Sequence, residues 1–245
     1  MTKLGIIQTG SFRTNKEGII KISALLEELG RKKTDIVCLP EQWLKENRID
    51  NFSTEFAPFL EIAKKYSMTI IPGAFYQKIR NQQTISSPVI GPKGTIIGIQ
   101  EKIHPFDYER DIIKPGKLAK IFETSCKFGV VICYDMVFPD VVNMMVRKGA
   151  KVILSPSRIV KRGIQPWHMY CQVRALENRV PILAANVHNY RFGGESIMID
   201  LVENNKVVIP KITKLKKQCA TAKQFDLEKY YNIRKRRFSD VQKFS

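Results

Sequence analysis

Hydrophobic and polar residues follow two different periods along this chain, and the periods predict strands and helices in turn. Residues 3–9 have the apolar pattern of a strand. Residues 16–29 carry apolar side chains at helical spacing and stop at Gly30, a residue type that commonly ends helices. A second strand is expected at 35–39 and a second helix at about 58–66. This alternation indicates a mixed α/β layer fold.

The alternation continues to the C-terminus. The apolar segment 69–75 predicts another strand, and Gly-Pro-Lys-Gly at 91–94 predicts a hairpin turn between strands at 85–90 and 95–100. Two sheets with helices outside both would account for the repeated pattern. The remaining expected elements are helices at 139–148 and 167–178, strands at 151–154, 180–185, 195–200, 206–212 and 219–225, a loop at 155–165, and an amphipathic segment from Leu227.

The length of 245 residues and a hydrophobic content of 44% allow one large core. We therefore expect a single domain over 1–245, with a core at about 1–205 and a basic C-terminal extension at about 206–245. The chain has no run of about 18 apolar residues, the length that a membrane span requires. Residues 1–16 also lack the apolar centre of a secretory signal. These features predict a cytoplasmic protein without a membrane partner.

The formal net charge of +18 is the unusual bulk property, and it could indicate nucleic acid, an anionic membrane or an acidic substrate. Half of it lies in residues 206–245, which hold twelve Lys or Arg and three acids. The run 234–237 is flanked by Tyr231 and Phe238, so basic and aromatic residues interleave as in single-strand binders. That signal is unspecific. We interpret the segment as a solvated face and do not expect a nucleic-acid partner.

The five cysteines are odd in number and widely spaced, without a C-x-x-C pair or metal-ligand spacing. Neither a disulfide framework nor a metal site is indicated, and the thiols are expected to be reduced. Cys133 differs from the others, because it ends the apolar run 129–132 and is followed at once by Tyr134-Asp135. A thiol where a strand turns into a helix is a candidate nucleophile, and Asp135 is expected to tether that turn.

Two other polar groups also follow apolar strands, Glu41 after 36–40 and Lys102 after 96–101. Strand ends are where catalytic groups converge in sheet-based α/β folds. A thiol needs a base or a nearby cation, which Glu41 and Lys102 could supply. Lys102 and the backbone N–H of Tyr134 could stabilise an oxyanion. The set predicts acyl transfer without histidine, metal or organic cofactor.

The segments L-P-E-Q-W at 39–43, E-K-I-H-P-F at 101–106 and G-V-V-I-C-Y-D-M-V-F-P-D at 129–140 occur in this order. Together they resemble the carbon–nitrogen hydrolase family, the nitrilase superfamily, and the similarity extends over roughly residues 3–200. The resemblance implies an α-β-β-α four-layer sandwich, with two mixed sheets flanked by helices. It also implies a homodimer or larger homo-oligomer that pairs through helices near the nucleophile.

The resemblance further implies the roles of the site residues. Glu41 would be the general base, Lys102 the oxyanion-stabilising cation and Cys133 the nucleophile. Many members carry a second glutamate before a Pro-Gly, and Glu109, six residues before Pro115, matches that placement. Trp43 beside Glu41 is expected to form a wall of the substrate pocket.

The substrate is a small amide or carbamoyl compound on this interpretation. The loop after Ser155-Pro156-Ser157 carries Arg158, Lys161 and Arg162, and in the family this loop lies near the pocket mouth. Ser157 and Arg158 are therefore candidate substrate-binding residues, together with Tyr134. Their charge predicts a preference for substrates with a carboxylate, such as ω-amides of dicarboxylic acids or N-carbamoyl acids.

Three alternatives stay open. The chain could be a catalytically silent scaffold that binds a partner or nucleic acid through its basic C-terminal segment. The same residues could also transfer the acyl group to an amine, or act on a nitrile.

Overall fold

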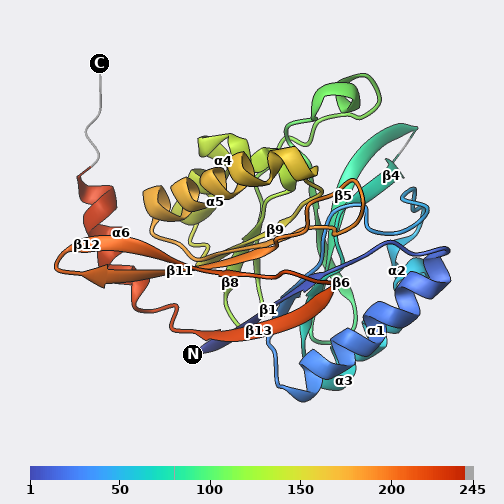
Figure 1. Cartoon of the computed structure of the whole chain (residues 1–245), viewed down its shortest axis with the longest axis horizontal. Coiled ribbons are helices and arrows are strands. Elements are labelled where there is room, and N and C mark those ends of the chain that lie inside the picture. The colour runs from blue at the N-terminus through green and yellow to red at the C-terminus, as the bar shows by residue number, and fades with distance from the viewer. Residues whose placement is uncertain (80, 241–245) are drawn as a thin grey trace.

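The computed structural model describes residues 1–79 and 81–240. Its strands form two sheets that pack face to face, with helices outside both (Figure 1). The last five residues of the expected C-terminal extension lie outside the described residues. In the part of the chain that is described, no helix is both long and apolar enough to cross a membrane.

The first sheet has seven strands in the order β13-β1-β2-β3-β5-β4, with β6 paired to β5. Strands β1, β2 and β3 run parallel, and β13 is antiparallel to β1 at the edge. The strand bounds are β1 Thr2–Gln8, β2 Ile36–Cys38, β3 Thr69–Ile71, β4 Phe75–Ile79, β5 Gln82–Ile90, β6 Ile96–Glu101 and β13 Cys219–Phe225.

The second sheet has six strands in the order β12-β11-β10-β9-β8-β7. Its centre, formed by β8, β9 and β10, is parallel, and its outer pairs are antiparallel. The strand bounds are β7 Ile121–Glu123, β8 Lys127–Val130, β9 Val152–Pro156, β10 Ile182–Ala185, β11 Ile197–Asn204 and β12 Val207–Lys214.

The helices cover the outer faces of the two sheets. Helices α1 (Asn15–Arg31) and α3 (Ala57–Tyr66) pack on the first sheet, with the short α2 (Phe52–Glu55) beside them. Helices α4 (Pro139–Arg147) and α5 (Ile164–Asn178) pack on the second sheet. A last helix, α6 (Tyr230–Ser239), contacts α5. The resulting layers confirm the expected α-β-β-α sandwich.

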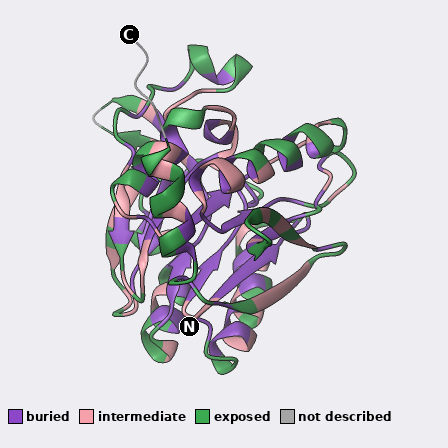
Figure 2. Cartoon of the chain, turned by 90° about the vertical axis from the view of Figure 1, so that its left-hand side faces the viewer, coloured by how far each residue is buried: buried purple, intermediate pink, exposed green. Residues whose placement is uncertain are grey.

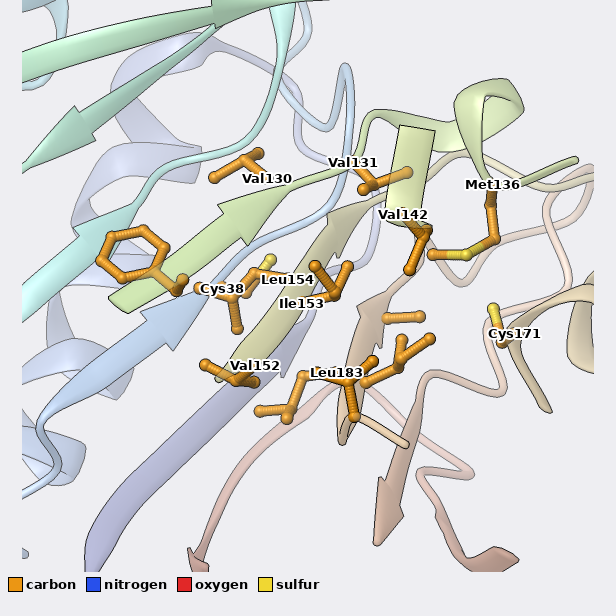
Figure 3. Packing of buried hydrophobic residues seen from close by; sticks show 14 of the residues in the cluster. Cys38, Val130, Val131, Met136, Val142, Val152, Ile153, Leu154, Cys171 and Leu183 are labelled. Atoms are coloured by element: carbon orange, nitrogen blue, oxygen red, sulfur yellow. The ribbon is translucent and has the colours of Figure 1, made fainter. Parts of the chain in front are cut away.

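A continuous apolar core lies between the sheets. Val130, Val152, Leu154 and Leu183 of the second sheet pack toward Cys38 of the first (Figure 3). Figure 2 shows the same division, with buried strands inside and exposed helix faces outside. Burial of apolar surface is the main favourable term in folding, so this seam fixes how the two sheets face each other. The loops at the ends of the strands are thereby held at fixed positions relative to one another.

The predicted elements agree with the observed ones except in a few places. The segment predicted as one strand at 69–75 is divided between β3 and β4, because Gly73 has a φ of +119° and turns the chain. A side chain at Gly73 would lie 2.2 Å from the carbonyl oxygen of Pro40, so only glycine fits there. Two short elements, α2 and β7, and all of β4 beyond Phe75 were not predicted.

The basic segment after residue 205 supplies an edge strand to each sheet, β12 to the second and β13 to the first. Helix α6 then packs against the body, where Arg234 donates hydrogen bonds to the carbonyl oxygen of Arg179 at 3.0 and 3.2 Å. The division of the chain into one core and one extension stays a prediction about domain organisation.

Candidate active site

A cavity of about 280 Å³ lies at the ends of the strands, where the loops of both sheets meet. Glu41, Lys102, Glu109 and Cys133 all line it. They follow β2, β6 and β8 or belong to the 3₁₀ turn Asp107–Asp111. The structure thus brings together four side chains that are separated by up to 92 positions in the sequence.

Cys133 stands at a sharp turn between β8 and the 3₁₀ turn Cys133–Val137. Its φ is +48°, a left-handed conformation that non-glycine residues adopt at a cost of about 1–3 kcal/mol. The apolar run before it is locked into the sheet, since the Val131 N–H donates to the carbonyl oxygen of Leu154 at 2.9 Å. The strained turn directs the sulfur into the cavity, as at nucleophile elbows in other α/β enzymes.

Asp135 connects this turn to the segment that follows Lys102. Its buried carboxylate accepts hydrogen bonds from the backbone N–H groups of Ile103 at 3.1 Å and His104 at 2.6 Å. The His104 ring also lies 3.0 Å from the same carboxylate and stacks on Phe138. The expected tethering role of Asp135 is confirmed, and it extends to a second chain segment.

A buried ion cluster forms the floor of the cavity. The Lys102 Nζ lies 3.0 Å from Oε1 of Glu41 and 2.8 Å from Oε2 of Glu109. The side chains are 1%, 3% and 4% exposed, in the order Lys102, Glu41, Glu109, so water screens these charges very little.

Backbone contacts hold each member of the cluster in place. The Glu41 N–H donates to the Ser157 carbonyl oxygen at 3.2 Å, and the Lys102 N–H donates to that of Ile85 at 2.8 Å. The Glu109 carboxylate accepts from the Phe106 N–H at 2.7 Å. The charged groups are therefore preorganised rather than mobile.

The surroundings shift the protonation of these groups. Burial raises the pKa of the Cys133 thiol, and the Glu41 carboxylate raises it further, whereas Lys102 and the Arg158 backbone N–H oppose the shift. The resting sulfur is thus a neutral thiol that needs a base. Burial acts to lower the pKa of Lys102, but the Glu41 and Glu109 carboxylates outweigh it and raise that pKa. The lysine therefore stays charged, while burial raises the pKa of Glu109.

The structure places the four candidate substrate-binding residues in two different environments. Tyr134 and Arg158 line the cavity. Trp43 lies outside its lining, packed against Phe12 and Phe59, and its indole N–H donates to the Pro72 carbonyl oxygen at 2.7 Å. The cause is the left-handed φ of +47° at Gln42, which places Gln42 in the cavity wall and Trp43 in the core.

Ser157 also lies outside the lining of the cavity. It follows β9 and is fully buried, and its hydroxyl lies 3.1 Å from that of Ser155. Its contribution to the site is the carbonyl oxygen that accepts from the Glu41 N–H. The expectation that Trp43 and Ser157 face the substrate pocket is therefore corrected, because both support the pocket from behind.

Several residues of the cavity wall were not predicted. Arg191 and Phe192 follow β10, and Phe106 and Tyr108 precede the second glutamate, Glu109. The Phe192 ring lies 4.4 Å from the Arg158 guanidinium carbon. No strand-end signal marks Arg191, which lies six residues beyond Ala185, the last residue of β10.

Comparisons with known proteins agree with this geometry. The family model described as carbon-nitrogen hydrolase matches residues 3–202. A probable nitrilase of Schizosaccharomyces pombe is 30% identical over 187 residues, which is 70% of this chain and 68% of that protein. An omega-amidase of Xenopus laevis is 27% identical over 205 residues, covering 75% of this chain and 74% of its own.

The fold is also similar to a solved structure. The crystal structure of a carbon-nitrogen hydrolase from Helicobacter pylori superimposes with a TM-score of 0.85, at 23% identity, over 98% of this chain and 95% of the other. The matched segment contains Glu41, Lys102, Glu109 and Cys133. This chain therefore belongs to the carbon–nitrogen hydrolase family and is an amidase-type hydrolase.

Proposed function

We propose that the protein is a thiol amidohydrolase that cleaves a non-peptide C–N bond of a small amide or carbamoyl compound through a thioester on Cys133. The observation that carries this proposal is the buried lysine that contacts two carboxylates beside the thiol, with Lys102 3.0 Å from Glu41 and 2.8 Å from Glu109. This arrangement supplies a nucleophile, a base and a fixed positive charge in one cavity.

In the first half-reaction Glu41 accepts the thiol proton as the Cys133 sulfur bonds to the substrate carbonyl carbon. The carbonyl electron pair moves to oxygen, where the Lys102 ammonium and the Tyr134 N–H stabilise the negative charge. Each such donor contributes about 3 kcal/mol of transition-state stabilisation. The C–N bond then breaks, and the proton held by Glu41 passes to the departing nitrogen, which leaves a thioester.

In the second half-reaction water replaces the amine. Glu41 accepts a proton from the water as its oxygen attacks the thioester carbon, and the same two donors hold the oxyanion. The carbon–sulfur bond breaks, the sulfur recovers the proton, and the acid is released. Glu109 keeps Lys102 charged and in position, since it contacts the ammonium and not the thiol.

The preferred substrate carries a carboxylate in this proposal, and Arg158 is the residue that supports it. Its Nη1 donates to the Gln42 side-chain oxygen at 2.7 Å, but its buried Nε has no hydrogen-bond partner among the described residues. Burying an unpaired polar donor costs about 1–3 kcal/mol. The guanidinium also lines the cavity, where a substrate carboxylate would pair with its positive charge, and Arg191 on the same wall adds a second one.

The mechanism is tested by intact-mass measurement after incubation with a panel of ω-amides, ureido acids and nitriles. A trapped acyl group is expected on the wild-type chain and not on Cys133→Ala, and peptide mapping should locate it at residue 133. Products are then compared with and without an added amine acceptor, which separates hydrolysis from acyl transfer. Full activity of the Cys133→Ala protein would contradict the proposal.

The substrate preference is tested separately, by comparing kcat/KM for a pair of amides that differ only in a distal carboxylate. A higher value for the carboxylate-bearing member supports the proposal. Equal values would remove the preference and leave the thioester mechanism standing.

We further propose that two copies pair through α4 and α5, and that the protein acts in the cytoplasm. Met169 and Val173, one helical turn apart on α5, are 59% and 43% exposed, and Met144 of α4 is 48% exposed. Such apolar side chains are favourable at an interface between copies. Analytical ultracentrifugation should give a dimer for the wild type and a monomer for Met169→Glu/Val173→Glu. A monomeric wild type would contradict the pairing.

A further inference from the structure

A second cavity, of about 360 Å³, lies on the other side of β6 from the active site. Glu101, the last residue of β6, lines this second cavity, whereas the next residue, Lys102, lines the first. Successive side chains of an extended chain point to opposite sides, so one strand end serves two separate cavities. The second cavity is also lined by Lys114, Lys117 and Lys120, with Ile79 and Leu118 on its rim. We call it the lysine cavity.

The lysine cavity carries an excess of positive charge. Three of its lining residues are lysines, and Glu101 is the single acid among the described residues that line it. Lys114 donates to the Gln82 side-chain oxygen at 2.6 Å and Lys120 to the carbonyl oxygen of Ile99 at 2.9 Å. An ammonium has three N–H donors, so both retain donors for a ligand. Lys117 forms no ion pair or hydrogen bond with any described residue.

The lysine cavity also has apolar lining residues. Leu118 is 62% exposed and Ile79 is 36% exposed, and Pro115 lies between the lysines. A fully hydrated inorganic ion would leave these side chains in water. A ligand with a compact dianionic group and an apolar or aromatic part would contact the lysines and the apolar residues at once.

The backbone beneath the lysine cavity is rigid and leads to the active site. The Gly116 N–H donates to the carbonyl oxygen of Lys102 at 2.7 Å. The buried Gln100 side chain donates to the carbonyl oxygen of Leu118 at 2.8 Å and accepts from the Lys120 N–H at 2.9 Å. Segment 114–120 is thus hydrogen-bonded twice to Gln100 of β6 and once to Lys102, so its lysines are held at fixed backbone positions.

We propose that the lysine cavity binds an organic phosphate, with the phosphate on Lys114, Lys117 and Lys120 and the organic group against Leu118 and Ile79. Three lysines that line one cavity match the two charges of a phosphate monoester better than the single charge of a carboxylate. The site is independent of the amide substrate, because a strand separates it from Cys133.

Binding is tested by calorimetry on the full chain with phenyl phosphate and with inorganic phosphate as probes. One saturable site per chain is expected, and phenyl phosphate should bind about fivefold more tightly because its ring buries apolar surface. Lys114→Gln/Lys117→Gln should weaken binding about tenfold, since two charge-assisted contacts are lost. The matched control Lys45→Gln/Lys93→Gln removes two exposed lysines elsewhere and should change the affinity less than about twofold.

Two further measurements locate the site. The Cys133→Ala chain should bind phenyl phosphate as the wild type does, and Leu118→Ser should remove the preference for the phenyl group. In the wild-type chain, hydrogen exchange of segment 114–120 should slow on binding, a readout that does not depend on any variant folding. Equal binding by the two double variants, protection confined to the loops around Cys133, or no saturable binding would each overturn the proposal.

Discussion

The active-site cavity and the C-terminal segment both concentrate charge, but they do so in opposite environments. In the cavity, Lys102, Glu41 and Glu109 are at most 4% exposed, and the Lys102 ammonium contacts the two carboxylates at 2.8–3.0 Å. On the C-terminal segment, the ion pair between Lys229 and Asp200 joins side chains that are 36% and 29% exposed. Exposed pairs contribute about 0–1 kcal/mol, whereas breaking a buried pair costs about 3–5 kcal/mol.

Burial, more than the number of charges, therefore determines whether charged residues form a chemical site. The C-terminal segment accounts for half of the net charge, yet α6 packs back on the body, where Arg147 lies over the Phe238 ring at 4.6 Å. The cavity holds few charges, and there burial and close neighbours shift the pKa values of Lys102, Glu109 and Cys133.

The largest expected effect comes from the proposed nucleophile. Cys133→Ala should lower turnover on the order of 10⁴-fold or more, because no other group can form the thioester. The matched control is Cys171→Ala, which alters a fully buried thiol in the apolar core. It should keep its turnover and lose about 1 kcal/mol of unfolding free energy from the small space it leaves. Kinetics and urea unfolding of both variants check this, and equal turnover in the two would contradict it.

Replacing Lys102, the cation of the buried cluster, should have the second-largest effect. Lys102→Met leaves the buried carboxylates of Glu41 and Glu109 without their partner, and should lower the unfolding free energy by about 3–5 kcal/mol in addition to abolishing turnover. Lys229→Met removes an exposed lysine with an ion pair and should cost less than about 1 kcal/mol. Urea unfolding compares the two variants. Similar losses would mean that burial does not separate the two regions.

Replacing Arg158, a positive charge on the cavity wall, should have a smaller effect. Arg158→Gln should lower kcat/KM for a carboxylate-bearing amide about 10- to 100-fold, the value of a charge-assisted hydrogen bond. The amide that lacks the carboxylate should change less than about threefold. Arg162→Gln, an exposed arginine outside the cavity lining, is the control. An equal loss on both amides would assign Arg158 to the fold rather than to the substrate.

The smallest effect is expected on α6. Lys235→Gln/Arg237→Gln removes two exposed charges, and Arg237 acts with burial to lower the pKa of Arg179, so repulsion between like charges decreases. Stability should change by less than about 0.5 kcal/mol and turnover should stay constant. Salt-dependent retention on a single-stranded DNA column should be weak in both chains. Strong retention that the variant loses would favour the nucleic-acid alternative.

Much of the fold and of the site follows from local patterns. The apolar runs before Glu41, Lys102 and Cys133 predict strands, and catalytic groups converge at strand ends in sheet-based α/β folds, so the convergence of these side chains could be expected. The family resemblance, through the position of Glu109 before Pro115-Gly116, also implied a site role for Glu109, which lines the cavity. These positions depend on short-range signals that survive in one sequence.

The remaining features depend on backbone conformations and distant contacts that periodicity does not report. The positive φ at Gln42 moves Trp43 into the core, and the turn at Gly73 divides one apolar run into two strands. Arg191 reaches the cavity only because β10 lies beside β9 in the second sheet. Each of these needs the packed molecule, since the local sequence is compatible with other placements.

The contacts of Asp135 determine how the active site responds to a shift of the loops around it. A single carboxylate ties the bend at the sulfur to the chain just past the ammonium, with contacts to two amides and an imidazole. Residues 103–104 and 133–135 are about thirty positions apart in the sequence, but Asp135 links them into one rigid unit. A displacement of either stretch therefore moves the Cys133 sulfur and the Lys102 ammonium together. The relative alignment of sulfur and ammonium is protected even where the surrounding loops shift.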